Sequence, residues 1–192
     1  MKGMEEAAEV LVSAARSGRR IVVFGDYDVD GVTSVAQLRA ALGRAGADAI
    51  AFLPHRLRDG YGLRPETVRR VIDEHRPGVI VTVDCGSAGR LGKLADRLAN
   101  AGETLVIDHH ASNDGNGSLD WIDPHAAATC EMVALLALRL GVSLDEGDGA
   151  LATVLMGGIV MDTATFAHPN ATTRTLAVSA APPELSNQAT VY

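Results

Sequence analysis

Residues 20–31 read RIVVFGDYDVDG, an apolar run followed at once by a cluster of acidic side chains. The first six residues are rich in β-branched and aromatic side chains, which is typical of a buried strand. Asp26, Asp28 and Asp30 come next, and residues 31–46 then carry apolar side chains at helical spacing. Three carboxylates within five residues repel one another, so their place between a strand and a helix needs a physical reason.

Short apolar runs alternate with helical patterns through the first part of the chain. This alternation indicates βαβ units and a parallel sheet, and strands that are apolar throughout indicate a sheet covered on both faces. We therefore predict an α/β fold with a doubly wound, mainly parallel sheet flanked by helices. The predicted strands are 20–25, 49–54, 78–84 and 104–108, and the helices between them are 31–46, 65–76 and 88–101.

A helical part is expected to follow the sheet. After WIDP at residues 121–124 the apolar spacing becomes helical, with helices predicted over 129–141, about 147–161 and 172–180. The first twenty residues are also charged and helix-like. We expect one domain over residues 1–180. Residues 181–192, which contain prolines and are mostly polar, read as a tail or a truncated linker.

Composition narrows the classes of function. The 192 residues are 47% hydrophobic but only 4% aromatic, and the net charge is −7. An acidic chain argues against a broad groove that grips the phosphates of long nucleic acids. We find no signal-peptide core and no apolar run of membrane-spanning length, which predicts a cytoplasmic protein without a membrane partner. Cys85 and Cys130 form no metal-binding spacing, and nothing favours a disulfide between them.

The polar residues that stand out all fall at predicted element ends. In an open α/β sheet, ligands bind at the carboxyl ends of the strands. The stretch 25–31 contains no Lys or Arg to offset its three carboxylates, and divalent cations would offset them well. Carboxylates together with imidazole suit Mn²⁺, with Mg²⁺, Co²⁺ or Zn²⁺ as competitors. The predicted metal cage comprises Asp26, Asp28, Asp30, Asp84, His109 and Asp162.

Simpler explanations exist for each of these residues alone. Asp30 suits a helix N-cap or a turn, and an Asp followed by two His suits an ordinary polar turn. Three aspartates in five residues also suit a solvated loop. The occurrence of all these groups at predicted strand or helix ends favours the metal cage.

Four segments in order resemble the motifs of the DHH phosphoesterase superfamily. They are GDYDVDGVTS (25–34), VTVDCG (81–86), VIDHH (106–110) and GGIVMDTATF (157–166). The resemblance implies a hydrolase of phosphate esters that uses two Mn²⁺-type ions, with Mg²⁺ or Co²⁺ as substitutes, and makes residues 1–180 a DHH-type catalytic domain. The family usually carries a second domain that grips the substrate, and this sequence stops before it.

Two branches of the superfamily are mixed in the chain. The first half resembles RecJ-type exonucleases, whereas the second half resembles the nano-RNase and pAp phosphatase branch. The latter usually has a His ahead of its first Asp-x-Asp, where this chain has Asp26. Because the chain is acidic and poor in stacking aromatics, we expect hydrolysis of short oligonucleotides or nucleotide phosphates. The alternatives are a RecJ-like 5′–3′ exonuclease on single-stranded DNA and an inactive binding module.

The resemblance also implies roles for the metal-site residues. Asp28 would bind one metal, Asp30 the other, and Asp84 both. Asp26 would support the first metal. His109 and Asp162 would complete the second site, Asp108 would orient His109 from behind, and His110 would face the scissile phosphate.

Five further residues are candidates for substrate binding. Arg56 and Arg58 precede a DGYG turn and are RecJ-like, although exposed arginines are more often plain surface. Arg174 either contacts phosphate or sits in the first turn of a helix. Thr33 and Ser34 stand where helix amides suit a phosphate, and simple helix capping explains them equally well. Cys85 replaces a residue that is commonly polar in the family, and is either a small buried hydrophobe or a source of oxidation sensitivity.

Overall fold

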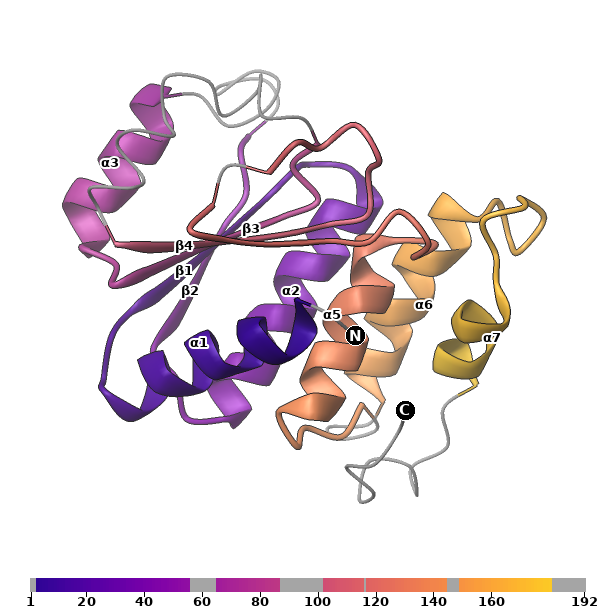
Figure 1. Cartoon of the computed structure of the whole chain (residues 1–192), viewed down its shortest axis with the longest axis horizontal. Helices are drawn as coiled ribbons and strands as arrows, with labels where there is room; N and C mark the ends of the chain where they lie inside the picture. Colours follow the sequence, from indigo (N-terminus) through magenta and orange to yellow (C-terminus); the bar gives the residue numbers. More distant parts are fainter. Residues whose placement is uncertain (1–2, 56–64, 87–101, 116, 145–148, 181–192) are drawn as a thin grey trace.

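The computed structural model describes residues 3–55, 65–86, 102–115, 117–144 and 149–180, and in these ranges strands and helices alternate before a helical C-terminal part (Figure 1). The described strands are β1 (Ile21–Gly25), β2 (Ala49–Phe52), β3 (Val79–Val83), β4 (Glu103–Asp108) and β5 (Leu119–Ile122). The described helices are α1 (Met4–Arg16), α2 (Val29–Arg44), α3 (Pro65–His75), α5 (Thr129–Arg139), α6 (Ala150–Asp162) and α7 (Thr173–Ser179).

The five strands form one parallel sheet in the order β2-β1-β3-β4-β5. Strand order reverses between β1 and β3, which is the point where ligands bind in open α/β sheets. Gly25 is level with Val83 on the neighbouring strand, and Val83 is level with Ile107. The aspartates that follow these three residues along the chain therefore leave the sheet at one level of its carboxyl edge.

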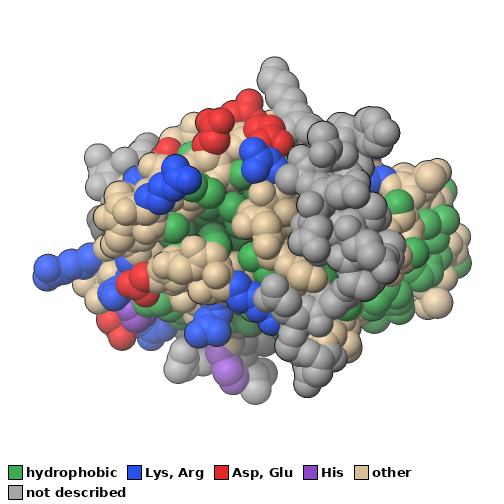
Figure 2. Space-filling model, turned by 90° about the horizontal axis from the view of Figure 1, so that it is seen from below, with side chains coloured by type: hydrophobic (Ala, Val, Ile, Leu, Met, Phe, Trp, Pro, Cys, Tyr) green, Lys and Arg blue, Asp and Glu red, His purple; other side chains and the backbone are tan. Residues whose placement is uncertain are grey.

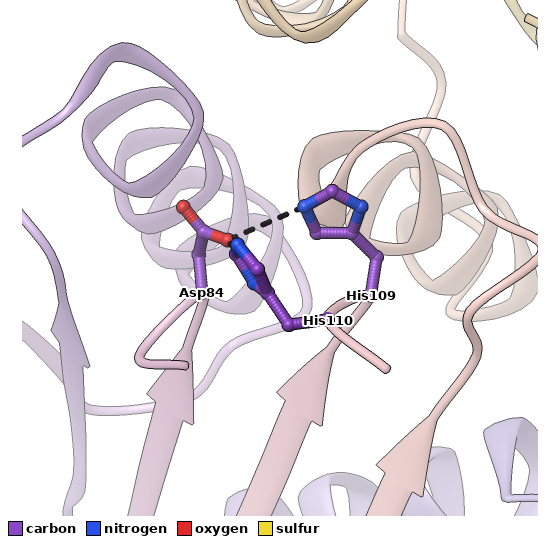
Figure 3. Close-up of side chains that lie close together, drawn as sticks. All are labelled: Asp84, His109 and His110. Atoms are coloured by element: carbon purple, nitrogen blue, oxygen red, sulfur yellow. Dashed lines mark ion pairs between the residues drawn. The ribbon is translucent and has the colours of Figure 1, made fainter. Parts of the chain in front are cut away.

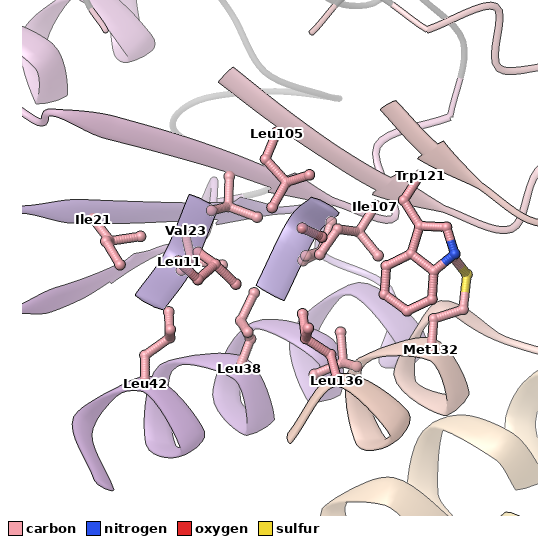
Figure 4. Close-up of a cluster of buried hydrophobic side chains, with 14 of the residues drawn as sticks. Leu11, Ile21, Val23, Leu38, Leu42, Leu105, Ile107, Trp121, Met132 and Leu136 are labelled. Carbon is pink, nitrogen blue, oxygen red and sulfur yellow. The ribbon is translucent and has the colours of Figure 1, made fainter. Parts of the chain in front are cut away.

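Helices cover both faces of the sheet, as predicted. The side chains of Val79, Val81 and Val83 pack toward α1, α2 and α5. Ile80, one position out of phase, packs with Phe24 and with α3 on the other face. Figure 4 shows the larger of these two cores, in which Leu11, Leu38 and Leu136 from the three helices meet β-strand side chains such as Ile107. This double coverage explains why the strands are apolar throughout.

Several element boundaries differ from the predictions. The strand β5 was not predicted; it is short and pairs only with β4 within the described residues. The second strand ends at Phe52 rather than 54. Helix α2 begins at Val29, two residues earlier than predicted, because the Asp28 carboxylate accepts the Gly31 amide at 2.8 Å and so caps the helix. The predicted helix 88–101 and the tail 181–192 lie outside the described residues.

The C-terminal helices pack against α2 and form a third core, beside the two that cover the faces of the sheet. Residues of α5 and α6, such as Ala134 and Leu155, pack there with Ala41 of α2. Helix α6 approaches closely at Gly158, where an added Cβ would overlap the Cys130 sulfur and lie 2.6 Å from Thr33 Oγ1. This contact brings the last residue of α6, Asp162, to the carboxyl edge of the sheet.

Charge is mixed on the surface that Figure 2 presents. Lys and Arg side chains of the described residues are interspersed there with Asp and Glu side chains. Among the described helices, we find no segment with the length and apolar character needed to cross a membrane.

Candidate metal centre

The imidazole of His109 lies at the middle of the carboxylate cluster. Its Nε2 is 3.2 Å from Asp162 Oδ2, 3.8 Å from Asp84 Oδ1 and 3.9 Å from Asp30 Oδ2. Figure 3 shows this ring facing Asp84 beyond the ends of the strands. These groups come from α2, the end of β3, the end of β4 and the end of α6, so the sheet register and the packing of α6 together assemble the cluster.

Asp30 is almost fully buried and is held by the N-terminus of α5. Its Oδ2 accepts the Thr129 amide at 2.6 Å, and its Oδ1 accepts the Cys130 amide at 2.9 Å. The Ser34 hydroxyl donates a longer bond of 3.4 Å. Burial and the charge of Asp162 raise the pKa of Asp30, although the two amides act in the opposite direction. The amides at the N-terminus of α5 thus help to compensate the negative charge of Asp30.

Asp84 has a strained backbone and an unusual electrostatic environment. Its φ of 55° is in the left-handed region, where a residue other than glycine persists only when its surroundings hold it. Oδ1 accepts the Thr129 hydroxyl at 3.2 Å, whereas the buried Oδ2 has no hydrogen-bond partner within the described part of the chain. Burial, with the nearby charges of Asp30 and Asp28, raises the pKa of Asp84 to about 10.

Asp108 orients His110, not His109 as the sequence suggested. Asp108 Oδ1 lies 2.8 Å from His110 Nδ1 and also accepts the His110 amide at 3.0 Å. Its other oxygen accepts the side-chain amide of Asn113 at 2.6 Å. Burial acts to raise the pKa of Asp108, but the hydrogen bonds from His110 and Asn113 outweigh it and lower the pKa. The carboxylate turns back on the residue two positions ahead, a local geometry that leaves His109 pointing into the cluster.

Two groups of side chains have the donor types and spacing to hold divalent cations. One comprises Asp30, His109 and Asp162, and the other comprises Asp84, His109 and His110. Burial alone would lower the pKa of His109, but Asp162 and Asp30 outweigh burial and raise it. A bound cation would provide a partner for the buried Asp84 Oδ2, which accepts no hydrogen bond within the described residues. It would also suit His109 Nε2, which faces three carboxylates. The residues present therefore fit a metal.

Asp26 and Asp28 lie beside this cluster but belong to neither group. Asp26 is buried, and its Oδ1 accepts the Tyr27 amide at 2.8 Å. Asp28 caps α2, and its charge helps to raise the pKa of Asp84. Gly31 lets the first turn of α2 lie close to the backbone of Asp26, because an added Cβ at Gly31 would lie 2.6 Å from the Asp26 carbonyl oxygen. Their predicted roles as ligands remain proposals.

The structure describes only some of the residues predicted to bind substrate. Arg56 and Arg58 lie outside the described residues. Thr33 and Ser34 cap nothing: Thr33 donates to the Val29 carbonyl at 2.7 Å, and Ser34 is buried against Asp30. Since Asp28 caps the helix, the prediction that Thr33 or Ser34 caps it is wrong, whereas their role in phosphate binding remains a prediction.

Arg174 is in the first turn of α7, but its guanidinium is held by carboxylates rather than offered to a phosphate. Nε donates to Glu131 at 2.6 Å, and a terminal nitrogen donates to Asp123 at 2.8 Å. Burial acts to lower the pKa of Arg174, and the two carboxylates outweigh it and raise the pKa. The physical reason is the side chain of Glu131, which is fully buried and needs a cationic partner.

Sequence reasoning missed Thr129 and Asn113, which contact the acidic residues directly. Thr129 begins the predicted helix 129–141, so the affinity of helix N-termini for anions was a usable signal. Asn113 carries no comparable signal, because its bond to Asp108 depends on how the chain turns after β4. Cys85 is buried in the smaller core, which supports its interpretation as a small hydrophobe. Neither cysteine forms a disulfide.

Comparison with known proteins places the chain in a family. Residues 20–159 match the model described as DHH family, N-terminal domain, and the chain belongs to the DHH family. It is 44% identical over 110 residues to the single-stranded-DNA-specific exonuclease RecJ of Thermus thermophilus, covering 57% of this chain and 16% of that protein. It is 41% identical over 117 residues to RecJ of Escherichia coli, covering 59% of this chain and 20% of that protein. The chain thus spans about a fifth or less of these relatives.

Solved structures agree on the fold. A crystal structure of exonuclease RecJ bound to manganese superposes with a TM-score of 0.73 and 30% identity, over 93% of this chain and 46% of that one. An exopolyphosphatase-related protein from Bacteroides fragilis shares the fold, with a TM-score of 0.70, 18% identity and coverage of 93% of this chain and 55% of that one. The sequence relatives above and the manganese-bound structure are RecJ proteins, so the chain resembles the RecJ branch in both comparisons.

Proposed function

We propose that this chain carries the hydrolytic centre of a metal-dependent phosphodiesterase of the RecJ type, acting at an end of single-stranded DNA. One observation carries the proposal: His109 joins two candidate metal-binding groups at the carboxyl edge of the sheet. That arrangement occurs in a chain of the DHH family that resembles RecJ proteins over more than half of its length. The retained set of acidic and imidazole groups speaks against an inactive binding module.

Asp30, Asp84, His109 and Asp162 from the two groups would hold the cations, with Asp26 and Asp28 beside them. Mn²⁺ is the first choice, because the donors are carboxylates and imidazole, and Mg²⁺ or Co²⁺ would substitute. Bound divalent cations lower the pKa of a coordinated water and stabilise charge on phosphoryl oxygens. The chain itself supplies carboxylates that are already oriented, since α5 amides fix Asp30 and the Thr129 hydroxyl fixes Asp84.

His110 is the group best placed to contact the scissile phosphate. Its side chain is 44% exposed, whereas that of His109 is 14% exposed. The bond to Asp108 engages Nδ1, so Nε2 is the nitrogen left for a substrate oxygen. A protonated ring would donate from Nε2 to a phosphoryl oxygen, with its charge balanced by the Asp108 carboxylate behind it.

A second candidate substrate class has one observation in its favour. The net charge of −7 suits short oligonucleotides or nucleotide phosphates, whose one or two phosphates the site itself could hold. Long strands gain affinity from many contacts with Lys and Arg, which makes their binding steeply dependent on salt.

Hydrolysis of a length series separates the two classes. The substrates are DNA and RNA of two to thirty nucleotides, labelled at either end, together with pAp, each with Mn²⁺ at two salt concentrations. The proposal expects stepwise release of nucleotides from the 5′ end of DNA, loss of activity with chelator, and no activity in Asp84→Asn. A preference for two- to five-nucleotide RNA or pAp would transfer the assignment to the second class. Full turnover by metal-free protein would contradict both.

A further inference from the structure

The turn at the head of α5, residues 127–131, supports the cluster from behind. Its Thr129 and Cys130 amides hold Asp30, and the Thr129 hydroxyl holds Asp84. A displacement of this turn would therefore move two carboxylates from two different elements at once. The side chains that hold this turn in place therefore affect the metal centre, although they do not contact Asp30 or Asp84 themselves.

A partly buried ion pair between Glu131 and Arg174 fixes the turn from within. The side chain of Glu131 is fully buried, and its Oε2 accepts the Ala127 amide at 3.2 Å, closing the turn on itself. Its Oε1 accepts Arg174 Nε at 2.6 Å, and Arg174 also donates to Asp123 at 2.8 Å. The guanidinium thus joins the first turn of α5 to the segment that leaves β5. A planar group with several donors suits this double contact better than an ammonium does.

The residue Asn170, just before α7, ties the same turn to the other side of the cluster. Its side-chain amide nitrogen donates to the Ala127 carbonyl and to the Asp162 carbonyl, at 3.1 Å each. Asp162 faces His109 from the end of α6. The short stretch from Asn170 to Arg174 therefore contacts both the turn that holds Asp30 and the backbone that carries Asp162.

We propose that Arg174 is a positioning residue: through Glu131 it sets the turn 127–131, and so the spacing of Asp30 and Asp84 at the metal centre. Asn170 assists by linking this turn to Asp162. The inference rests on the proposed metal-dependent function for its consequence in metal binding. The positional effect itself is a property of the metal-free protein and is tested separately.

The experiment compares Arg174→Gln with the double variant Glu131→Gln/Arg174→Gln. In the double variant, residue 131 no longer carries a buried negative charge that has lost its cationic partner. Arg139→Gln is the matched control, because Arg139 pairs with Glu5 at 2.8 Å in a half-exposed ion pair on the same helix α5, away from the cluster. Circular dichroism selects folded variants, and Arg174→Lys carries the test if Arg174→Gln does not fold. Two quantities are then measured: amide hydrogen exchange in metal-free protein, and Mn²⁺ affinity by calorimetry.

In Arg174→Gln and in the double variant, hydrogen exchange of the Thr129 and Cys130 amides should quicken by about tenfold or more. Amides further along α5, such as that of Leu136, should keep their exchange rates. Mn²⁺ affinity should fall by about 10- to 100-fold, the range for groups that orient metal ligands. Arg139→Gln should change neither quantity. Unchanged exchange and unchanged Mn²⁺ affinity in folded Arg174 variants would overturn the proposal. Faster exchange in a protein whose native form binds no Mn²⁺ would keep Arg174 as a positioning residue and refute the metal-dependent function instead.

Discussion

The carboxylate of Asp30 accepts the amide of Cys130 at 2.9 Å, a contact between residues 100 positions apart in the chain. It shows how three neighbouring aspartates coexist. Asp26 bonds to the Tyr27 amide, Asp28 caps α2, and Asp30 points to the head of α5. Each carboxylate accepts hydrogen bonds from different backbone amides, and these bonds help to offset the repulsion within residues 26–30.

Replacing Asp84 by Asn should separate stability from function. Asn has a similar volume and tolerates the left-handed φ of 55°, but it has no charge to bury. The metal-free variant should gain stability, on the order of 1–2 kcal/mol at pH 8, because a buried carboxylate with a pKa of about 10 opposes folding there. Mn²⁺ binding and turnover should be lost.

Urea denaturation and calorimetric metal titration of Asp84→Asn check both parts. Asp48→Asn is the control, since that side chain forms an exposed ion pair with Arg20 and should leave metal binding unchanged. Near-native turnover in Asp84→Asn would be incompatible with a role for Asp84 in holding metal.

The carboxyl edge of the sheet could be predicted because it follows from periodicity alone. Apolar runs gave the strands β1, β3 and β4, and the residues after them, Asp26, Asp84 and Asp108, lie at one level because the strands are parallel and in register. Asp162 could be predicted only from its motif, because the periodicity of the sequence does not show that α6 ends at the carboxyl edge of the sheet. The four-residue strand β5 was missed because it carries only a short apolar signal.

The partners of the site residues could not be predicted, because they depend on tertiary contacts. His109 and His110 are adjacent in sequence, and only the backbone turn after β4 decides which ring meets Asp108. The contacts of Arg174 span 43 and 51 residues, so its location in the first turn of a helix gave no sign of a buried glutamate.

Changing His109 and His110 one at a time should affect different steps. His109→Ala removes the nitrogen that faces three carboxylates and should lower Mn²⁺ affinity by at least about tenfold. His110→Ala removes a more exposed ring and should lower kcat by about 10²- to 10³-fold, the usual cost of losing one donor to developing charge. Calorimetry and steady-state kinetics on both variants give the comparison. Equal loss of metal in the two would refute this division of roles.

Metal-free protein should lose stability as pH rises from 5 to 8. Asp84 releases its proton near pH 3.8 when unfolded but only at about 10 when folded, so the folded state binds more protons throughout this window. The raised pKa of His109 acts in the same direction, and the lowered pKa of Asp108 has taken full effect before pH 5. Each such group contributes a slope of up to about 1.4 kcal/mol per pH unit.

Urea denaturation at four pH values, with chelator and with saturating Mn²⁺, measures this slope. Mn²⁺ should flatten or reverse it, because the cation displaces protons from its ligands. Asp84→Asn in chelator should show a shallower slope than the native chain. Metal-free stability that rises over the window would contradict the electrostatic account of the cluster.

Two adjacent glycines of α6 offer a test of how packing positions Asp162. An alanine methyl at Gly158 would overlap the Cys130 sulfur and lie 2.6 Å from Thr33 Oγ1, so α6 would have to move away from α2 and α5. Overpacking of this kind costs about 1–3 kcal/mol. Because Asp162 is one helical turn further on, the movement should also lengthen the 3.2 Å distance from Asp162 to His109 and weaken Mn²⁺ binding.

Gly157→Ala is the matched control, because the atom nearest to the added methyl group, a Thr33 methyl carbon, would be 3.8 Å away. That substitution should be neutral or stabilise the helix by about 0.5–1 kcal/mol, with Mn²⁺ affinity unchanged. Urea denaturation and metal titration of the two variants decide the matter, and a Gly158→Ala protein that keeps native Mn²⁺ affinity would show that the packing of α6 at this point does not set the position of Asp162.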